Sequence, residues 1–175
     1  MEKLPKILIT NDDGINSPGI FELANALKGI GEIIIVAPEN QQSAVSSALT
    51  VSRPLRVKKF YRDGEFFGYA VDGTAADCVK LALNNLLDSK PDLVVSGINH
   101  GKNTAINVLY SGTVGGAIEG MLFGIKSIAV SVDSHSYDFS CQVSAKYTAE
   151  VASIALRNDM PSDTFLNVNI PALSN

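Results

Sequence analysis

The sequence has 175 residues, of which 46% are hydrophobic and 18% charged, so residues 1–175 are long enough to form one domain around a sizeable core. The formal net charge of −4 excludes a broad basic surface, and we expect no surface for nucleic acid. No apolar run approaches the roughly 20 residues that a membrane span requires, and the N-terminus has no signal-peptide pattern, so we expect a cytoplasmic protein without membrane contacts.

Short apolar runs alternate with segments of helical periodicity along most of the chain. Helical spacing covers residues 19–28, 74–87, 113–123 and 142–156, and the apolar runs that predict strands are residues 6–10, 33–37, 92–96, 127–132 and 165–170. Residues 50–71 have an extended pattern, in which Asp63-Gly64 predicts the turn of a hairpin. The sequence therefore predicts a doubly wound, Rossmann-like α/β fold, with a mostly parallel sheet, helices on both faces and an inserted β-hairpin.

Polar segments follow several of these predicted strands. Residues 11–14, 38–43 and 97–103 each come directly after an apolar run, and Asp133 follows another. Because ligands bind at the carboxyl ends of the strands in such sheets, we expect these segments to meet at one edge.

Asp12 and Asp13 are adjacent carboxylates followed by Gly14, which permits a tight backbone turn. Two carboxylates this close repel each other unless a cation lies beside them. A solvated turn with Asp12 as a helix cap explains the same residues about equally well. Ser43 and Asn99, with Asn103 close by, could add oxygen ligands of the kind that Mg²⁺ or Mn²⁺ prefers, although each alone is more typical of a turn.

Ser111, Gly112 and Thr113 precede a predicted helix that begins with small residues. Free N–H groups and the positive end of a helix dipole suit phosphate, whereas ordinary capping by Ser111 or Thr113 is the simpler reading. His100 and His135 are candidates for proton transfer by residue type alone, and they rank below the two carboxylates. Cys78 and Cys141 have no CxxC or CxxH neighbour, so neither a disulfide framework nor a zinc site is expected.

Six separated segments, taken together, resemble the SurE survival-protein family of 5'/3'-nucleotidases. They are ILITNDDGINSPGI, APENQQSAVSSALT, YAVDGTAADCV, PDLVVSGINHGKN, YSGTVGGAIEG and NVNIP, in the same order and over nearly the whole chain. The resemblance implies a single divalent ion, Mg²⁺ or Mn²⁺, and a catalytic role for Asp12 and Asp13. The metal ligands that it implies are Asp12, Asp13, Ser43 and Asn99, and the substrate-binding residues are Asn11, Asn103, Ser111, Gly112 and Thr113.

From this resemblance we expect a metal-dependent phosphomonoesterase that releases phosphate from nucleoside 5'- and 3'-monophosphates, as some family members also do from short polyphosphate. The main alternative is a non-catalytic nucleotide- or phosphate-binding module that uses the Ser111–Thr113 helix terminus without a metal. A glycosyltransferase-like enzyme with an acidic metal site is a weaker alternative.

The sequence departs from the family pattern at three places. Ala44 stands where Gly commonly follows the metal-binding Ser, and Ala75 stands where Pro is usual. Family members also continue beyond NVNIP through a C-terminal segment used in subunit exchange, whereas this sequence stops at Asn175. We therefore expect a SurE-like domain that lacks this segment and that nonetheless assembles as a homodimer or homotetramer.

Overall fold

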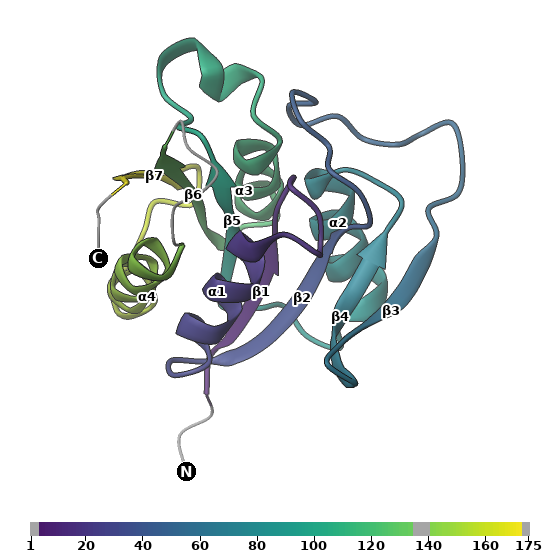
Figure 1. The fold of residues 1–175 in the computed structure, drawn as a ribbon, viewed down its shortest axis with the longest axis horizontal. Helices are drawn as coiled ribbons and strands as arrows, with labels where there is room; N and C mark the ends of the chain where they lie inside the picture. The colour runs from purple at the N-terminus through teal and green to yellow at the C-terminus, as the bar shows by residue number, and fades with distance from the viewer. Residues whose placement is uncertain (1–3, 135–140, 173–175) are drawn as a thin grey trace.

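Seven strands form one sheet that is covered by helices on both faces (Figure 1), in a computed structural model that describes residues 4–134 and 141–172. The strands are β1 (Lys6–Thr10), β2 (Glu32–Pro38), β3 (Val57–Arg62), β4 (Glu65–Val71), β5 (Leu93–His100), β6 (Lys126–Asp133) and β7 (Leu166–Pro171). The α-helices are α1 (Pro18–Leu27), α2 (Ala75–Leu81), α3 (Gly112–Leu122) and α4 (Gln142–Arg157). A π-helical turn, η1 (Ala82–Leu86), and a 3-10 helix, η2 (Ala105–Leu109), complete the elements.

The strand order is β3-β4-β2-β1-β5-β6-β7, and every neighbouring pair is parallel except β3 and β4. Strands β2 and β4 lie on one side of β1, and β5, which follows them in the chain, lies on the other side. This reversal makes a switch point between β1 and β5, where ligands bind in sheets of this kind. The predicted doubly wound fold is confirmed.

The predicted hairpin is also confirmed, with Asp63 and Gly64 at its turn and both in the positive-φ region. Its second strand pairs in parallel with β2, through Val36 opposite Tyr69. The hairpin therefore extends the sheet, because β4 pairs directly with β2 of the central parallel strands.

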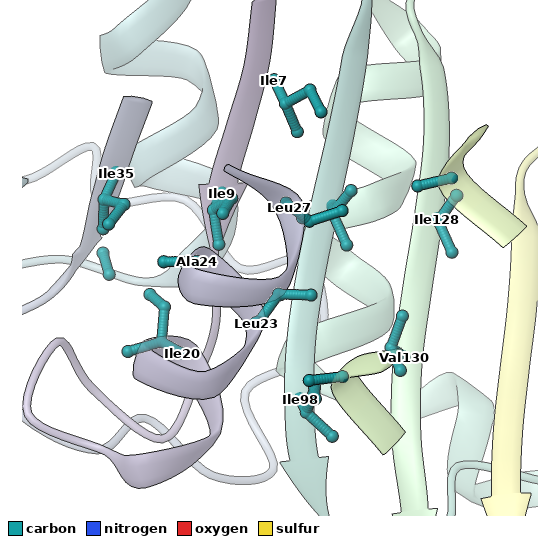
Figure 2. Close-up of a cluster of buried hydrophobic side chains, with 14 of the residues drawn as sticks. Ile7, Ile9, Ile20, Leu23, Ala24, Leu27, Ile35, Ile98, Ile128 and Val130 are labelled. Atoms are coloured by element: carbon teal, nitrogen blue, oxygen red, sulfur yellow. The ribbon is translucent and has the colours of Figure 1, made fainter. Parts of the chain in front are cut away.

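Alternating side chains of the central strands enter separate cores on the two faces of the sheet. Ile7 and Ile9 of β1 pack with α1 and α4, whereas Leu8 packs with Val79 of α2 on the other face. Figure 2 shows the first of these clusters, in which Ile20, Leu23, Ala24 and Leu27 bring one face of α1 against the sheet. Burying each large aliphatic side chain contributes about 1.5–3 kcal/mol, so the apolar runs both build the sheet and hold its helices in place.

Two elements differ from the sequence prediction. Helical spacing predicts one helix over residues 74–87, but α2 ends at Leu81 and continues as the π-helical turn η1. Strand β5 continues to His100, although residues 97–103 are predicted as a loop, because Asn99 and His100 pair with β6 after a register shift. Gly97 lies within this irregularity with φ +143°, and a Cβ there would lie 2.4 Å from the carbonyl oxygen of Val130.

Cys78 and Cys141 are both free and buried. None of the helices within residues 4–134 and 141–172 is long and apolar enough to cross a membrane.

Candidate active site

The loops after β1 and β2 are joined at the carboxyl edge of the sheet. The N–H of Gln42 donates to the carbonyl oxygen of Asp12 at 2.7 Å, and the N–H of Ile15 donates to that of Pro38 at 2.8 Å. Gly14 allows this close approach, because it has φ +93° and a Cβ there would lie 3.3 Å from the carbonyl carbon of Asn40. The turn predicted after the two aspartates is therefore present, and it presents them beside the second loop.

Five of the predicted site residues line one cavity of about 260 Å³ at this edge. They come from separate segments, after β1, after β2, at the end of β5 and before α3: Asp12, Ser43, Asn99, Asn103 and Ser111. The other lining residues are Ala44, His100, Gly101, Lys102, Asn107 and Tyr110. The convergence expected from strand ends is confirmed for Asp12, Ser43, Asn99 and Asn103, and Ser111 joins them from the start of α3.

Asp12 is held against the start of α3. Its side chain is only 5% exposed, and its Oδ1 accepts a hydrogen bond of 2.5 Å from the hydroxyl of Thr113. Burial, and to a smaller extent the charge of Asp13, raise the pKa of Asp12 to about 6 against the lowering effect of the Thr113 hydrogen bond. The helix comes this close because residue 112 is glycine, where a Cβ would lie 2.8 Å from that of Asp12.

Asp13 lies at the boundary between this cavity and its neighbour. It lines a second cavity of about 360 Å³, which shares His100 with the first. The backbone N–H of His100 donates to Asp13 Oδ2 at 3.3 Å, and burial raises the pKa of the Asp13 carboxyl above its ordinary value.

Gln41 connects two of the predicted metal ligands. Its Nε2 donates to Ser43 Oγ at 2.9 Å and to Asp13 Oδ1 at 3.4 Å. One amide group therefore holds side chains from the first and second loops close together.

The oxygen donors at this edge fit a hard divalent cation. Asp12 and Asp13 offer carboxylates with raised pKa values, whose charge a cation would compensate. Asn99 uses its amide nitrogen to donate to Gly101 O at 2.6 Å, which leaves its carbonyl oxygen as the end for a ligand. In the described part of the chain, no three His, Cys, Asp or Glu residues cluster so as to hold a metal. A metal here would thus use Ser and Asn oxygens beside the two carboxylates, as Mg²⁺ and Mn²⁺ accept.

The start of α3 opens onto the same cavity through Ser111. The Ser111 hydroxyl accepts from the N–H of Val114 at 3.1 Å, so the ordinary capping role is present at a residue that also lines the cavity. Thr113 is fully buried, and its hydroxyl is directed to Asp12. The helix terminus therefore offers a phosphate site mainly through Ser111, while Gly112 and Thr113 support Asp12.

Asn11 braces the first loop and is absent from the residues that line the two cavities. Its Nδ2 donates to Gly14 O at 2.9 Å and to Ser17 Oγ at 2.8 Å. His135, the other histidine candidate, lies outside the described residues.

Sequence reasoning overlooked three residues of the site. Lys102 is a cation in the wall of the first cavity, and its Nζ lies 3.2 Å from Asp133 Oδ2. Tyr110 lines the same wall, and Gln41 connects Asp13 with Ser43. Their one signal in the sequence is position, because each lies within two residues of one that was predicted for the site.

The fold and the cavity define a doubly wound α/β protein with an oxygen-rich, acidic site beside a helix N-terminus at the switch point of its sheet. The family model described as Survival protein SurE matches residues 7–175. The chain belongs to this family, and the resemblance noted from its six segments is confirmed.

Relatives named 5'-nucleotidase SurE match nearly the whole chain. The protein from Chlorobium phaeobacteroides is 51% identical over 170 residues, which are 97% of this chain and 65% of that protein. The protein from Pelobacter propionicus is 51% identical over 165 residues, or 94% of this chain and 65% of the relative. The chain thus spans about 65% of the length of these two relatives.

A solved structure, the crystal structure of the SurE protein from Aquifex aeolicus, has a TM-score of 0.89 to this chain at 45% identity. The likeness covers 97% of this chain and 67% of that one. It independently supports the α/β fold described above.

Proposed function

We propose that this protein is a metal-dependent phosphomonoesterase that hydrolyses nucleoside monophosphates to nucleoside and phosphate. Its relatives bear the name 5'-nucleotidase, and the wall of one cavity combines oxygen donors for a cation with the start of a helix suited to phosphate. The observation that carries the proposal is that Asp12, Ser43, Asn99 and Ser111 meet around this single cavity.

The residues divide the work according to their positions. Asp12, Asp13, Ser43 and Asn99 would hold one Mg²⁺ or Mn²⁺, which when bound neutralises charge on the phosphate and lowers the pKa of a water. Asp12, which lines the cavity wall, would orient the attacking water. Direct attack by water requires no covalent enzyme intermediate.

The phosphate would lie between the start of α3 and the segment after β5. Ser111 and the first turn of α3 offer hydrogen-bond donors and a positive dipole end. Asn103 and Lys102 also line the cavity wall, and Lys102 adds a positive charge that a chain of net charge −4 must supply locally.

The finer parts of the proposal are activity on nucleoside 3'-monophosphates and on short polyphosphate, and assembly as a homodimer or homotetramer. The family resemblance supports them. Light scattering over a range of concentrations tests the assembly, and only monomer at every concentration would contradict it.

The function is tested by measuring phosphate release from a panel of nucleoside 5'- and 3'-monophosphates and tripolyphosphate, in Mg²⁺, in Mn²⁺ and after chelation. We expect hydrolysis of 5'-monophosphates that is lost on chelation and restored by either metal. Binding of phosphate without release under any condition would instead identify a non-catalytic module. A requirement for an activated sugar donor would identify a transferase.

A further inference from the structure

Strand β7 presents two asparagines on the same face. Asn167 and Asn169 are two residues apart, so their side chains leave the strand on one side, while Val168 and Ile170 pack into the core on the other. Such alternation on the last strand of a sheet is commonly a solvated face. Here both asparagine side chains contact the backbone of Asn103.

Asn169 pairs with Asn103 through both ends of its amide. Its Oδ1 accepts from the N–H of Asn103 at 2.8 Å, and its Nδ2 donates to the carbonyl oxygen of Asn103 at 3.3 Å. Asn167 adds a second donor to that carbonyl oxygen at 2.9 Å and accepts from Asn169 Nδ2 at 3.3 Å. The backbone N–H and C=O of Asn103 thus both find partners on β7, as they would in a sheet ladder.

The side chain of Asn103 is anchored as well. It is 7% exposed, and its Nδ2 donates to Ser131 Oγ at 2.8 Å. Ser131 of β6 lies opposite Asn169 in the ladder, so two neighbouring positions of adjacent strands hold one residue of the cavity wall. This bond fixes the Asn103 rotamer and uses one of the two N–H groups of its amide, which leaves the second N–H as a donor for phosphate.

We propose that Asn169, assisted by Asn167, is a positioning residue that holds Asn103 and the segment from Gly101 to Asn103 in the geometry that binds the substrate's phosphate end. The proposal rests on the proposed function, in which Asn103 lines the phosphate site. Residues 101–103 carry no regular secondary structure, so no backbone hydrogen-bond ladder fixes their conformation. The side chains of β7 order these residues instead. The side chains of β7 position the cavity wall through hydrogen bonds alone. An Asn→Ala substitution removes these bonds with little change in backbone preference.

The hydrogen bonds from Asn167 and Asn169 to Asn103 form what we call the clamp. It is tested with Asn169→Ala, Asn167→Ala and Asn103→Ala, singly and combined. We expect Asn169→Ala to raise KM for a nucleoside 5'-monophosphate about tenfold with kcat changed less than about threefold, and Asn167→Ala to have a smaller effect because one bond to Asn103 is lost. In the Asn103→Ala background, Asn169→Ala should add less than about twofold, since both act through the same residue. Amide hydrogen exchange at Asn103 should accelerate in Asn169→Ala.

Asn84→Ala is the matched control, because Asn84 Nδ2 donates to the carbonyl oxygen of Lys80 at 2.8 Å on an exposed helical segment. Its KM should equal that of the wild type. The positioning role is overturned if Asn169→Ala leaves KM unchanged, or if its effect is undiminished in the Asn103→Ala background, as a general loss of stability would produce.

Calorimetric titration with inorganic phosphate separates this proposal from the proposed function. If the wild-type protein binds phosphate without hydrolysing any monophosphate, the phosphatase function fails, and a roughly tenfold weaker Kd for phosphate in Asn169→Ala still supports the clamp. Equal phosphate affinity in the two proteins contradicts the clamp whatever the activity. If the wild type neither binds phosphate nor hydrolyses a monophosphate, both proposals fail.

Discussion

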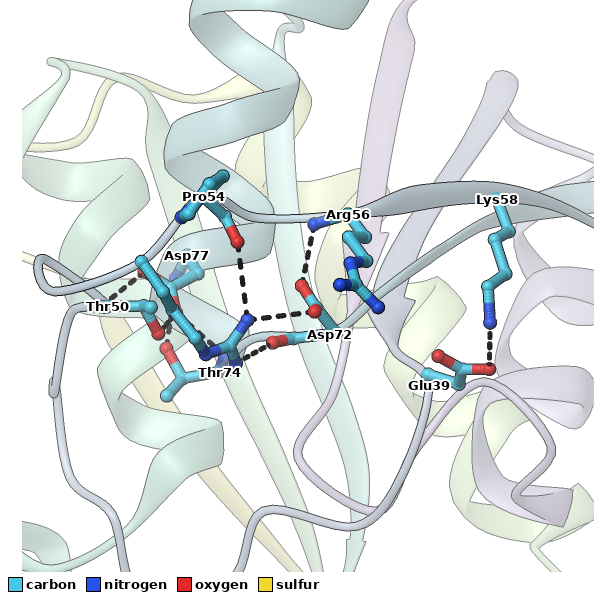
Figure 3. Close-up of polar contacts among 9 residues, drawn as sticks. Glu39, Thr50, Pro54, Arg56, Lys58, Asp72, Thr74 and Asp77 are labelled. Atoms are coloured by element: carbon cyan, nitrogen blue, oxygen red, sulfur yellow. Dashed lines mark hydrogen bonds and ion pairs between the residues drawn. The ribbon is translucent and has the colours of Figure 1, made fainter.

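Two pairs of carboxylates lie beside the same sheet and differ in how their surroundings compensate the negative charge. Asp72 directly follows β4, and Asp77 lies in the first turn of α2; both are surrounded by donors (Figure 3). Asp77 alone accepts from the N–H and hydroxyl of Thr50, at 2.9 and 2.7 Å, and from the N–H of Thr74 at 3.0 Å. Asp72 and Asp77 therefore stabilise the fold by joining separate segments of the chain.

Asp12 and Asp13 are less completely compensated. Asp12 accepts from the hydroxyl of Thr113, and the backbone N–H groups of Thr113 and of Asp12 itself also lower its pKa. Asp13 accepts weakly, at 3.3 and 3.4 Å, from His100 and Gln41. Burial raises the pKa of both, whereas a hydrogen bond from the N–H of Arg56 and the neighbouring Arg53 lower the pKa of Asp72. Hydrogen-bond donors and cations therefore compensate the carboxylates that stabilise the fold, whereas those at the switch point keep raised pKa values and remain for a ligand.

The largest effect is expected from Asp12→Asn. Hydrolysis should fall about a hundredfold or more, because a ligand charge is lost from the proposed metal site. In chelator, the free energy of unfolding should stay within about 1 kcal/mol of the wild type or rise, since the substitution removes a carboxylate whose burial raises its pKa despite its hydrogen bonds. Phosphate-release assays and urea unfolding measure the two quantities. A stability loss that accounts for the lost activity would refute this half of the comparison.

The opposite outcome is expected for Asp77→Ala. The free energy of unfolding should fall by about 2–3 kcal/mol, because the substitution removes a capping box and leaves the Thr50 donors without this partner. The kcat of the remaining folded protein should be close to that of the wild type. Urea unfolding measures the stability, and kinetics at a single temperature measure kcat. If the variant keeps wild-type stability but has an impaired kcat, Asp77 belongs to the active site instead.

A smaller effect separates two helix caps of the same kind. Ser111→Ala should weaken phosphate or nucleotide binding about tenfold while metal affinity changes less than about twofold, because Ser111 lines the cavity. Thr74→Ala removes the equivalent cap of α2, away from the cavity, and should cost about 1 kcal/mol of stability without changing binding. Calorimetry with inorganic phosphate and with Mn²⁺ measures both affinities. Equal loss of phosphate binding in the two variants would remove the special role of Ser111.

The smallest effect concerns pH and Asp72. Because its folded pKa lies below the ordinary value of 3.8, its ionised form stabilises the fold above that pH, and this contribution disappears as the pH falls through the folded pKa. The stability difference between wild type and Asp72→Asn should therefore be constant from about pH 7 to 5 and should shrink below about pH 4. Urea unfolding across this range measures it. A difference that persists to the lowest pH would show that charge is not the cause.

Much of this molecule is predictable from its sequence, because its strands are continuous apolar runs and its polar segments follow them. Asp12, Ser43, Asn99 and Asn103 were expected to meet at the strand ends and do line one cavity, together with Ser111. The extension of β5 to His100 was missed, since glycine and asparagine in residues 97–103 are typical of a loop and only pairing with β6 makes part of it a strand.

The contacts between distant side chains were less accessible. Thr113 was expected to face phosphate, yet its hydroxyl is directed to Asp12, which the absence of a side chain at Gly112 permits. The role of NVNIP was also hidden, because the amide of Asn169 meets the backbone of Asn103 across 66 positions of sequence. Such partners depend on tertiary register, which local propensity does not encode.

Calorimetric titration of Mn²⁺ into chelator-treated protein asks whether Asp12 and Asp13 at the switch point hold a divalent cation. We expect one ion bound per chain in the wild type and in Asp72→Asn, and binding at least about tenfold weaker in Asp13→Asn, whose activity excess metal should partly restore. No binding by the wild type, or equal binding by Asp13→Asn, would contradict it.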